Sequence, residues 1–219
     1  MFALVFGGWI NVKPLIKSHL QLALAQQDFL KFKRNNKVFD SLLRQKEVEM
    51  GSEVKENLIS FGSDYSSTTI TFITNPFCGY CIESYKVYKS LLKSHGKAIK
   101  LNMLFNVSTS DKENKAYQIG IKLIELYHAG KRDLAFQALD DWFTSRDVDQ
   151  WQKRYGTTNN DIEKYDDILQ AQKNWCTSNK ISYTPAIIID RYLYPSEYKM
   201  ADLSVLIDQL IFERKEKSA

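Results

Sequence analysis

The stretch "FITNPFCGYC", residues 72–81, carries two of the three cysteines of this 219-residue chain. It overlaps the β-branched run "TITFIT" (69–74), which predicts a buried strand, and Pro76 marks the end of that strand. From Cys78 onward, apolar residues recur at helical spacing as far as Gly96. The sequence therefore predicts a strand that ends in a Cys-x-x-Cys motif and continues directly as a helix.

Three kinds of site would use such a cysteine pair: a thiol–disulfide couple, a zinc site and an inert structural disulfide. A zinc site would need Cys176 together with one of the three histidines, His19, His95 or His128. Zinc ligands usually occur as two closely spaced pairs, and the chain has no second pair. The spacing favours a redox couple, and the other two uses stay open.

The predicted position of the pair explains why redox chemistry is favoured. At the start of a helix, unpaired N–H groups and the helix dipole stabilise a thiolate. Cys78 is therefore predicted to be the attacking sulfur. Cys81, one helical turn later, would attack a mixed disulfide formed at Cys78 and so release the product.

The remaining elements predict an α/β fold. A helix over 79–95 joins strand 69–74 to strand 98–107, which predicts a parallel pair with a right-handed crossover. Residues 110–178 are predicted to be helical almost throughout. The other predicted elements are strands at 57–63, 184–190 and 191–195 and a closing helix at 200–213.

Residues 1–56 are predicted to form an N-terminal extension. The apolar run "MFALVFGGWI" (1–10) is too short to cross a bilayer, which takes about twenty residues. It is either a buried N-terminal element or the trailing end of a transmembrane helix whose remainder is missing. Apolar residues at helical spacing predict one or two amphipathic helices over 14–49, with a break near Asn35 and Asn36.

Composition restricts the partners of the chain. The net charge of +4 is small, and the 44% of hydrophobic residues is typical of a soluble globular protein. Three cysteines cannot build a disulfide scaffold. The densest basic cluster has no aromatic platform beside it, so it is interpreted as a solvated helix face and no nucleic-acid partner is expected. This cluster consists of Lys31, Lys33, Arg34 and Lys37.

Together with "SYTPAIIID" (182–190), the cysteine motif resembles the thioredoxin superfamily. The resemblance implies a thioredoxin-like fold over 57–213, with a mixed central sheet flanked by helices, followed by a charged tail at 214–219. In that superfamily the proline of a Thr-Pro pair before a strand is cis and lies beside the cysteines, which here is Pro185. The backbone of Thr184 would then pair with an extended substrate segment.

The helical block at 110–178 resembles the insertion of the DsbA-like branch, and the Gly-Tyr dipeptide resembles that of periplasmic disulfide isomerases. The pattern "NPFCGYC … LQAQKNWC … ISYTPAIIID … YLYPSEYKMADL" is similar to the thioredoxin-like domain fused to bacterial vitamin K epoxide reductase homologues, over roughly 57–212. This implies a periplasmic domain, membrane-tethered in the full-length protein. Such a domain exchanges disulfides with protein clients and with a membrane-bound, quinone-linked partner. The resemblance implies no cofactor and no metal.

Two positions depart from the resemblance. Phe72 occupies the place where many thioredoxins carry a buried acid that accepts the proton of the second thiol, so Cys81 must use water or another group. Tyr85 stands where a histidine is expected in the fused domains. Cys176, which follows Trp175, is interpreted as a buried inert thiol or as a relay thiol near the site.

The predicted function is protein thiol–disulfide exchange, of oxidase or isomerase type, through Cys78 and Cys81. Phe77 and Tyr80 would give the site an apolar rim suited to partly unfolded clients. The alternative is a non-catalytic thioredoxin-like module that docks a partner through the helices at 14–49. The presence of both cysteines together with the Thr-Pro pair favours the enzyme.

Overall fold

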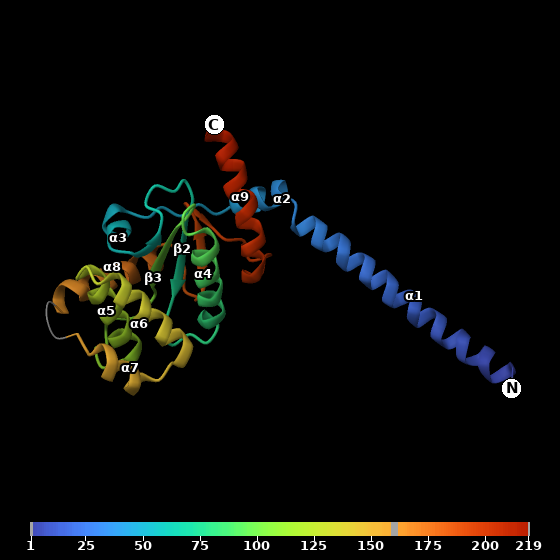
Figure 1. Ribbon diagram of the computed structural model, residues 1–219, viewed down its shortest axis with the longest axis horizontal. Coiled ribbons are helices and arrows are strands. Elements are labelled where there is room, and N and C mark those ends of the chain that lie inside the picture. The colour runs from blue at the N-terminus through green and yellow to red at the C-terminus, as the bar shows by residue number, and fades with distance from the viewer. Residues whose placement is uncertain (1, 159–161, 219) are drawn as a thin grey trace. The chain divides into compact units, whose positions relative to one another are not determined.

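The computed structural model describes residues 2–158 and 162–218 of the chain. The chain forms two compact units, Met1–Leu42 and Leu43–Ala219. The second unit contains the sheet (Figure 1). Cys78 and Cys81 lie within its residue range.

The first unit is mainly one long helix, α1 (Phe2–Lys33). Asn35 then starts α2 (Asn36–Leu43), because its side-chain oxygen accepts a hydrogen bond from the Lys37 backbone N–H at 3.0 Å. The predicted break near Asn35 is confirmed.

The backbone of the apolar run at 2–10 is helical and continuous with the rest of α1. The side chains of residues 1–12 lie outside the described part of the chain, as do those of the predicted charged tail at 214–219. Within the described residues, no helix is both long enough and sufficiently apolar to cross a membrane.

The second unit is built on a mixed sheet whose strand order is β1-β3-β2-β4-β5 within the described residues. The central pair is parallel, and the other neighbouring pairs are antiparallel. The predicted parallel pairing of strands 69–74 and 98–107 is therefore confirmed. The strands are β1 (Ile59–Gly62), β2 (Thr69–Thr74), β3 (Lys100–Phe105), β4 (Ala186–Ile189) and β5 (Tyr192–Leu193).

Helices follow the predicted order around this sheet. One helix connects β2 to β3, and the block predicted as helical over 110–178 forms successive helices between β3 and β4. A short 3-10 turn leads into the last helix. The helices are α3 (Ser52–Glu56), α4 (Cys81–His95), α5 (Lys115–His128), α6 (Arg132–Ser145), α7 (Val148–Tyr155), α8 (Ile162–Ser178), η1 (Met200–Asp202) and α9 (Leu203–Ser218).

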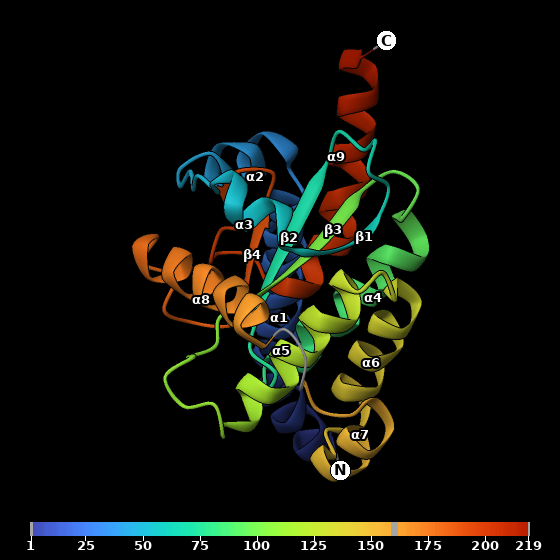
Figure 2. The same ribbon diagram turned by 90° about the vertical axis from the view of Figure 1, so that its left-hand side faces the viewer.

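Helices cover both faces of the sheet (Figures 1 and 2). Successive residues of a strand point to opposite faces. Phe72 of β2 contacts the Tyr88 ring of α4, with ring centroids 5.2 Å apart, while its neighbour Ile73 lies in a buried cluster with Cys176 of α8. The α4 face of β2 is therefore the face from which the cysteine pair is reached, and α8 lies on the other face.

Candidate active site

The chain leaves β2 and reaches the cysteine pair through a turn at Asn75. The Asn75 side-chain oxygen accepts a hydrogen bond from the Phe77 N–H at 2.9 Å, and its carbonyl accepts one from the Cys78 N–H at 3.0 Å. The Asn75 side-chain amide donates to the Asn106 carbonyl at 3.0 Å, just after β3. These bonds place Cys78 beyond the end of the central strand.

Helix α4 begins at Cys81 and not at Cys78, where the sequence predicts its N-terminus. The Cys81 N–H donates to the Cys78 carbonyl at 3.2 Å, so the motif forms one turn that leads into the helix. Cys78 therefore lies three residues before the first helical residue.

The two thiols differ in exposure and both are free. Cys78 is partly exposed, whereas the Cys81 side chain is fully buried. The Cys78 thiol donates a hydrogen bond to the Thr184 carbonyl at 3.3 Å, across 106 residues of sequence. The peptide bond between Thr184 and Pro185 is cis, the form that the resemblance implies. The structure thus brings the cysteine motif and the Thr-Pro pair together.

The surroundings of the two thiols give them different acidities. Burial raises the pKa of the Cys78 thiol. Hydrogen bonds from the Cys81 thiol, from the Thr184 side chain and from the Cys81 and Tyr80 backbone N–H groups lower this pKa by more. The net pKa of Cys78 lies below its usual value. Burial raises the pKa of the Cys81 thiol to about 11. This is the order that an attacking thiol and a resolving thiol require.

Three aromatic side chains next to the cysteine pair or the Thr-Pro pair in sequence expose apolar surface. The exposed fractions are 44% for Phe77, 82% for Tyr80 and 51% for Tyr183. The sequence predicts the first two as the rim of the site. It does not predict Tyr183, although its position directly before the Thr-Pro pair is a usable signal.

Helix α6 holds the segment before Cys78. The Trp142 Nε1–H and an Arg146 Nη2–H both donate to the Pro76 carbonyl at 2.9 Å. The Phe77 ring packs on Trp142, with centroids 5.1 Å apart, and lies 5.8 Å from the Arg146 guanidinium. The sequence does not predict these contacts, because 66 and 70 residues separate the donors from the acceptor.

Tyr85 and Phe72, the two departures from the thioredoxin pattern, both take part in the packing of α4. Tyr85 stacks on Phe143 of α6, with ring centroids 4.7 Å apart, and its hydroxyl donates to the Asp140 carboxylate at 3.3 Å. Tyr85 therefore belongs to the packing of α4 on α6. Phe72 packs on Tyr88 and supplies no proton acceptor to the cysteine pair.

The third cysteine lies in the core. Cys176 is fully buried, and burial raises the pKa of its thiol to about 12. This environment agrees with a buried inert thiol. His95 contacts the Asp208 carboxylate at 2.5 Å, and His128 contacts the Asn57 carbonyl at 3.4 Å. Among the described residues, no group of three or more histidine, cysteine or acidic side chains is arranged to hold a metal ion.

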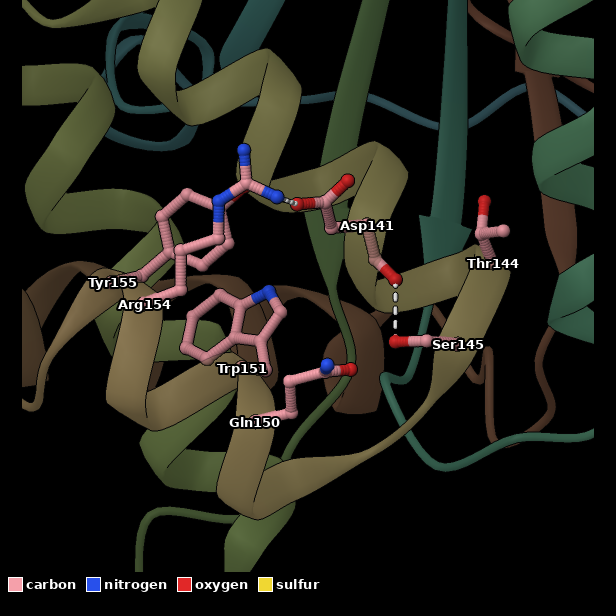
Figure 3. Close-up of a pocket in the computed structure, with 7 residues that line it drawn as sticks. All are labelled: Asp141, Thr144, Ser145, Gln150, Trp151, Arg154 and Tyr155. Carbon is pink, nitrogen blue, oxygen red and sulfur yellow. Dashed lines mark hydrogen bonds and ion pairs between the residues drawn. The ribbon is translucent and has the colours of Figure 1, made fainter.

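A hollow of about 220 Å³ lies between α6 and α7 (Figure 3). Its Asp141 carboxylate accepts hydrogen bonds from the Arg154 guanidinium at 2.6 Å and from the Tyr155 hydroxyl. The acid is therefore neutralised by neighbouring side chains. Neither cysteine of the pair lines this hollow.

Cys78 is expected to be the first thiol that iodoacetamide alkylates. Because its pKa is lowered and its sulfur is partly exposed, it should react at neutral pH faster than a free cysteine, whose pKa is about 8.5. The rate should rise with pH and level off before a free thiol does. Cys81 and Cys176 should stay unmodified until the protein unfolds. Peptide mass spectrometry checks this, and equal labelling of all three would contradict it.

No protein-family model and no curated protein sequence matches the chain. Among solved structures, the thiol-disulfide exchange protein alpha-DsbA2 from Wolbachia pipientis has a TM-score of 0.59 at 16% identity, covering 80% of this chain and 97% of that one. A periplasmic thioredoxin-like protein from Salmonella enterica serovar Typhimurium has a TM-score of 0.57 at 14% identity, covering 74% and 98%. Oxidised BdbD from Bacillus subtilis has a TM-score of 0.55 at 13% identity, covering 77% and 98%.

These likenesses show the fold. The chain has the thioredoxin-like fold of DsbA-like proteins, with a mixed sheet flanked by helices, and the predicted fold class is confirmed. The similarity to the domain fused to vitamin K epoxide reductase homologues stays a prediction.

Proposed function

We propose that this chain is a thiol–disulfide oxidoreductase that exchanges disulfides with protein substrates through Cys78 and Cys81. The asymmetry of the pair carries the proposal. One sulfur is partly exposed and has a lowered pKa, while the other is buried and retains its proton. The Thr184 carbonyl contacts the exposed sulfur, so a substrate sulfur that reaches Cys78 meets a backbone segment able to pair with an extended chain.

In the proposed reaction, the Cys78 thiolate attacks one sulfur of a client disulfide. The S–S bond of the client breaks, its other sulfur leaves as a thiolate, and a mixed disulfide forms between Cys78 and the client. Cys81 loses its proton and attacks the Cys78 sulfur, and the client leaves as a second thiolate. Each client thiolate takes up one proton. The products are a Cys78–Cys81 disulfide and a reduced client, and the reverse sequence oxidises a client dithiol.

The proposed clients are partly unfolded proteins. Phe77, Tyr80 and Tyr183 expose apolar surface next to Cys78 and Thr184. A folded client buries its apolar side chains, whereas an unfolded segment presents them together with unpaired backbone groups. The aromatic rim and the Thr184 backbone are suited to such a segment.

The proposal extends to an extracytoplasmic location and a membrane-bound, quinone-linked redox partner. One compared structure is described as periplasmic. The motif pattern over 57–212 is similar to that of the domain fused to vitamin K epoxide reductase homologues. Both observations support a domain that works outside the cytoplasm, tethered to the membrane in the full-length protein. The Gly-Tyr dipeptide favours the oxidase or isomerase direction over that of a reductase.

The experiment that tests this function is the equilibrium reduction potential of the Cys78–Cys81 couple against glutathione, with Cys176 replaced by Ser. We expect one two-electron couple between about −120 and −180 mV, the range of oxidases and isomerases. A value near about −270 mV would retain the exchange chemistry but make the protein a reductase.

Absence of a two-electron couple would overturn the proposal. The chain would then fit a non-catalytic module that docks a partner through α1 and α2. Leu20, Phe29 and Phe32 of α1 expose apolar surface that a partner would cover.

A further inference from the structure

The resolving thiol must lose a proton in a buried place. The Cys81 side chain is fully buried, and Phe72 stands where many thioredoxins have the acid that accepts this proton. A thiolate formed there needs a hydrogen-bond donor, because burial disfavours its charge.

Thr74, the last residue of β2, is on the correct face to supply that donor. Side chains two apart on a strand share a face, so Thr74 lies on the same side as Phe72, which contacts Tyr88 of α4. Cys81 is the first residue of the same helix. The end of β2 and the start of α4 thus bring the Thr74 hydroxyl toward the buried sulfur.

The Thr74 side chain is only 3% exposed. Its carbonyl accepts a hydrogen bond from the Asn106 N–H at 2.8 Å, but its hydroxyl oxygen has no hydrogen-bond partner among the described residues. Buried hydroxyls are normally paired, because an unpaired one is unfavourable. The unpaired hydroxyl is therefore available to a group that becomes a stronger acceptor during the reaction.

The Cys81 thiol is such a group, because its sulfur becomes a stronger acceptor when it loses its proton. Burial and the Cys78 thiol raise the Cys81 pKa, whereas the Thr74 hydroxyl, the Asn75 backbone N–H and the Thr184 side chain lower it. No acid is among these groups. Among the groups that lower the Cys81 pKa, the Thr74 hydroxyl has the largest effect.

Building on the proposed function, we propose that Thr74 is a positioning residue for the resolving step, with its hydroxyl donating a hydrogen bond to the Cys81 thiolate. Cys81 releases its proton to water, and the Thr74 hydroxyl keeps its own proton while it stabilises the sulfur. The thiolate attacks the Cys78 sulfur of the mixed disulfide. The Sγ–Sγ bond forms as the bond to the client breaks, and the client thiolate takes up a proton.

The first test measures the acidity of Cys81 directly in the full chain. With Cys78 and Cys176 both replaced by Ser, the ultraviolet absorbance of the thiolate against pH reports Cys81 alone. Thr74→Val should lower the thiolate fraction at a given pH about tenfold, which is one pH unit in the titration midpoint. Thr74→Ser, which retains the hydroxyl, should restore the parent titration. Thr74→Ala serves the same purpose as the valine variant if that protein does not fold.

Thr71→Val is the matched control. Thr71 is in the same strand and is also 3% exposed, but its hydroxyl accepts a hydrogen bond from the Asn102 side-chain amide at 3.3 Å. Its replacement should leave the Cys81 titration unchanged. A Thr74→Val or Thr74→Ala titration equal to that of the parent would overturn the proposal.

The second test uses the exchange reaction with Cys176→Ser as the parent. After Cys78 is loaded with glutathione, Thr74→Val should slow the release of glutathione about three- to fourfold at neutral pH, because the greater nucleophilicity of a more basic thiolate partly offsets its smaller fraction. Attack by Cys78 should keep its parent rate. Equal slowing of both steps would indicate general damage and overturn the assignment. The titration of Cys81 does not depend on exchange. Failure of Thr74 alone is therefore distinguishable from failure of the proposed function, in which no redox couple titrates at all.

Discussion

Replacing Cys81 with Ser is expected to trap client proteins on Cys78 as stable mixed disulfides. The serine hydroxyl cannot perform the second attack, so the reaction should stop after the first one. Cys78 remains partly exposed, with the Thr184 carbonyl beside it, and the first attack should proceed at close to its normal rate. The adducts are measured by non-reducing gel electrophoresis and mass spectrometry after exposure to an oxidised, partly unfolded client.

Two matched variants give this experiment its controls. Cys78→Ser removes the attacking sulfur, so no adduct should form and exchange should fall on the order of 10³-fold or more. Cys176→Ser should leave trapping unchanged, because Cys176 lies in the core and holds its proton. If Cys81→Ser yields no adducts, or if adducts form on Cys176, the assignment of the two thiols is wrong.

Trp142→Ala is expected to cause a large loss of unfolding free energy and to loosen the segment before Cys78. Trp142 is fully buried, packs on Phe77 and Trp151, and donates to the Pro76 carbonyl at 2.9 Å. Removing a buried tryptophan of this kind costs about 3–5 kcal/mol of unfolding free energy. Denaturant unfolding measures the loss, and alkylation of Cys78 reports the change at the site.

Trp151→Ala separates the two effects. Trp151 is also buried, at 3% exposure, but its indole N–H donates to the Ala138 carbonyl at 2.7 Å and not to Pro76. It should lose a similar unfolding free energy and keep the parent alkylation rate of Cys78. Trp142→Phe retains a ring beside Phe77 and loses the N–H, and Arg146 still donates to Pro76. It should therefore cost about 1–2 kcal/mol. Identical alkylation in all three variants would contradict a role for α6 at the site.

Much of the fold is predictable because its signals are local. The β-branched run at 69–74, the stop at Pro76 and the helical spacing after Cys78 lie within about thirty residues. A parallel pair joined by a helix follows from that order, and β2 and β3 pair in this way. The helix was predicted over 79–95, and α4 begins two residues later, at Cys81. A helix begins where its hydrogen bonds begin, and the first turn here is closed by the bond from Cys81 to Cys78.

In the candidate site, the residues that local sequence or the resemblance indicates are predictable, whereas the contacts between distant segments are not. The two cysteines are adjacent in sequence, and the resemblance supplies Thr184 and Pro185. The contacts of Pro76 with Trp142 and Arg146 have no sequence signal, because they join segments 66 and 70 residues apart. Tyr183 is exposed beside the Thr-Pro pair; its position directly before that pair is a signal for the site, but the local pattern does not say whether its side chain is exposed.

By itself, the sequence determined the strand, the cysteine pair and the helix that follows, because strand and helix periodicity and a two-residue spacing are properties of neighbouring residues. The packing of segments distant in sequence sets which sulfur is exposed, which is buried and which groups surround each one. The acidity of a thiol depends on burial and on the hydrogen bonds that reach it. At Cys78 and Cys81 the groups that lower the pKa include the side chains of Thr74, at the end of β2, and Thr184, just before β4, which only folding brings together.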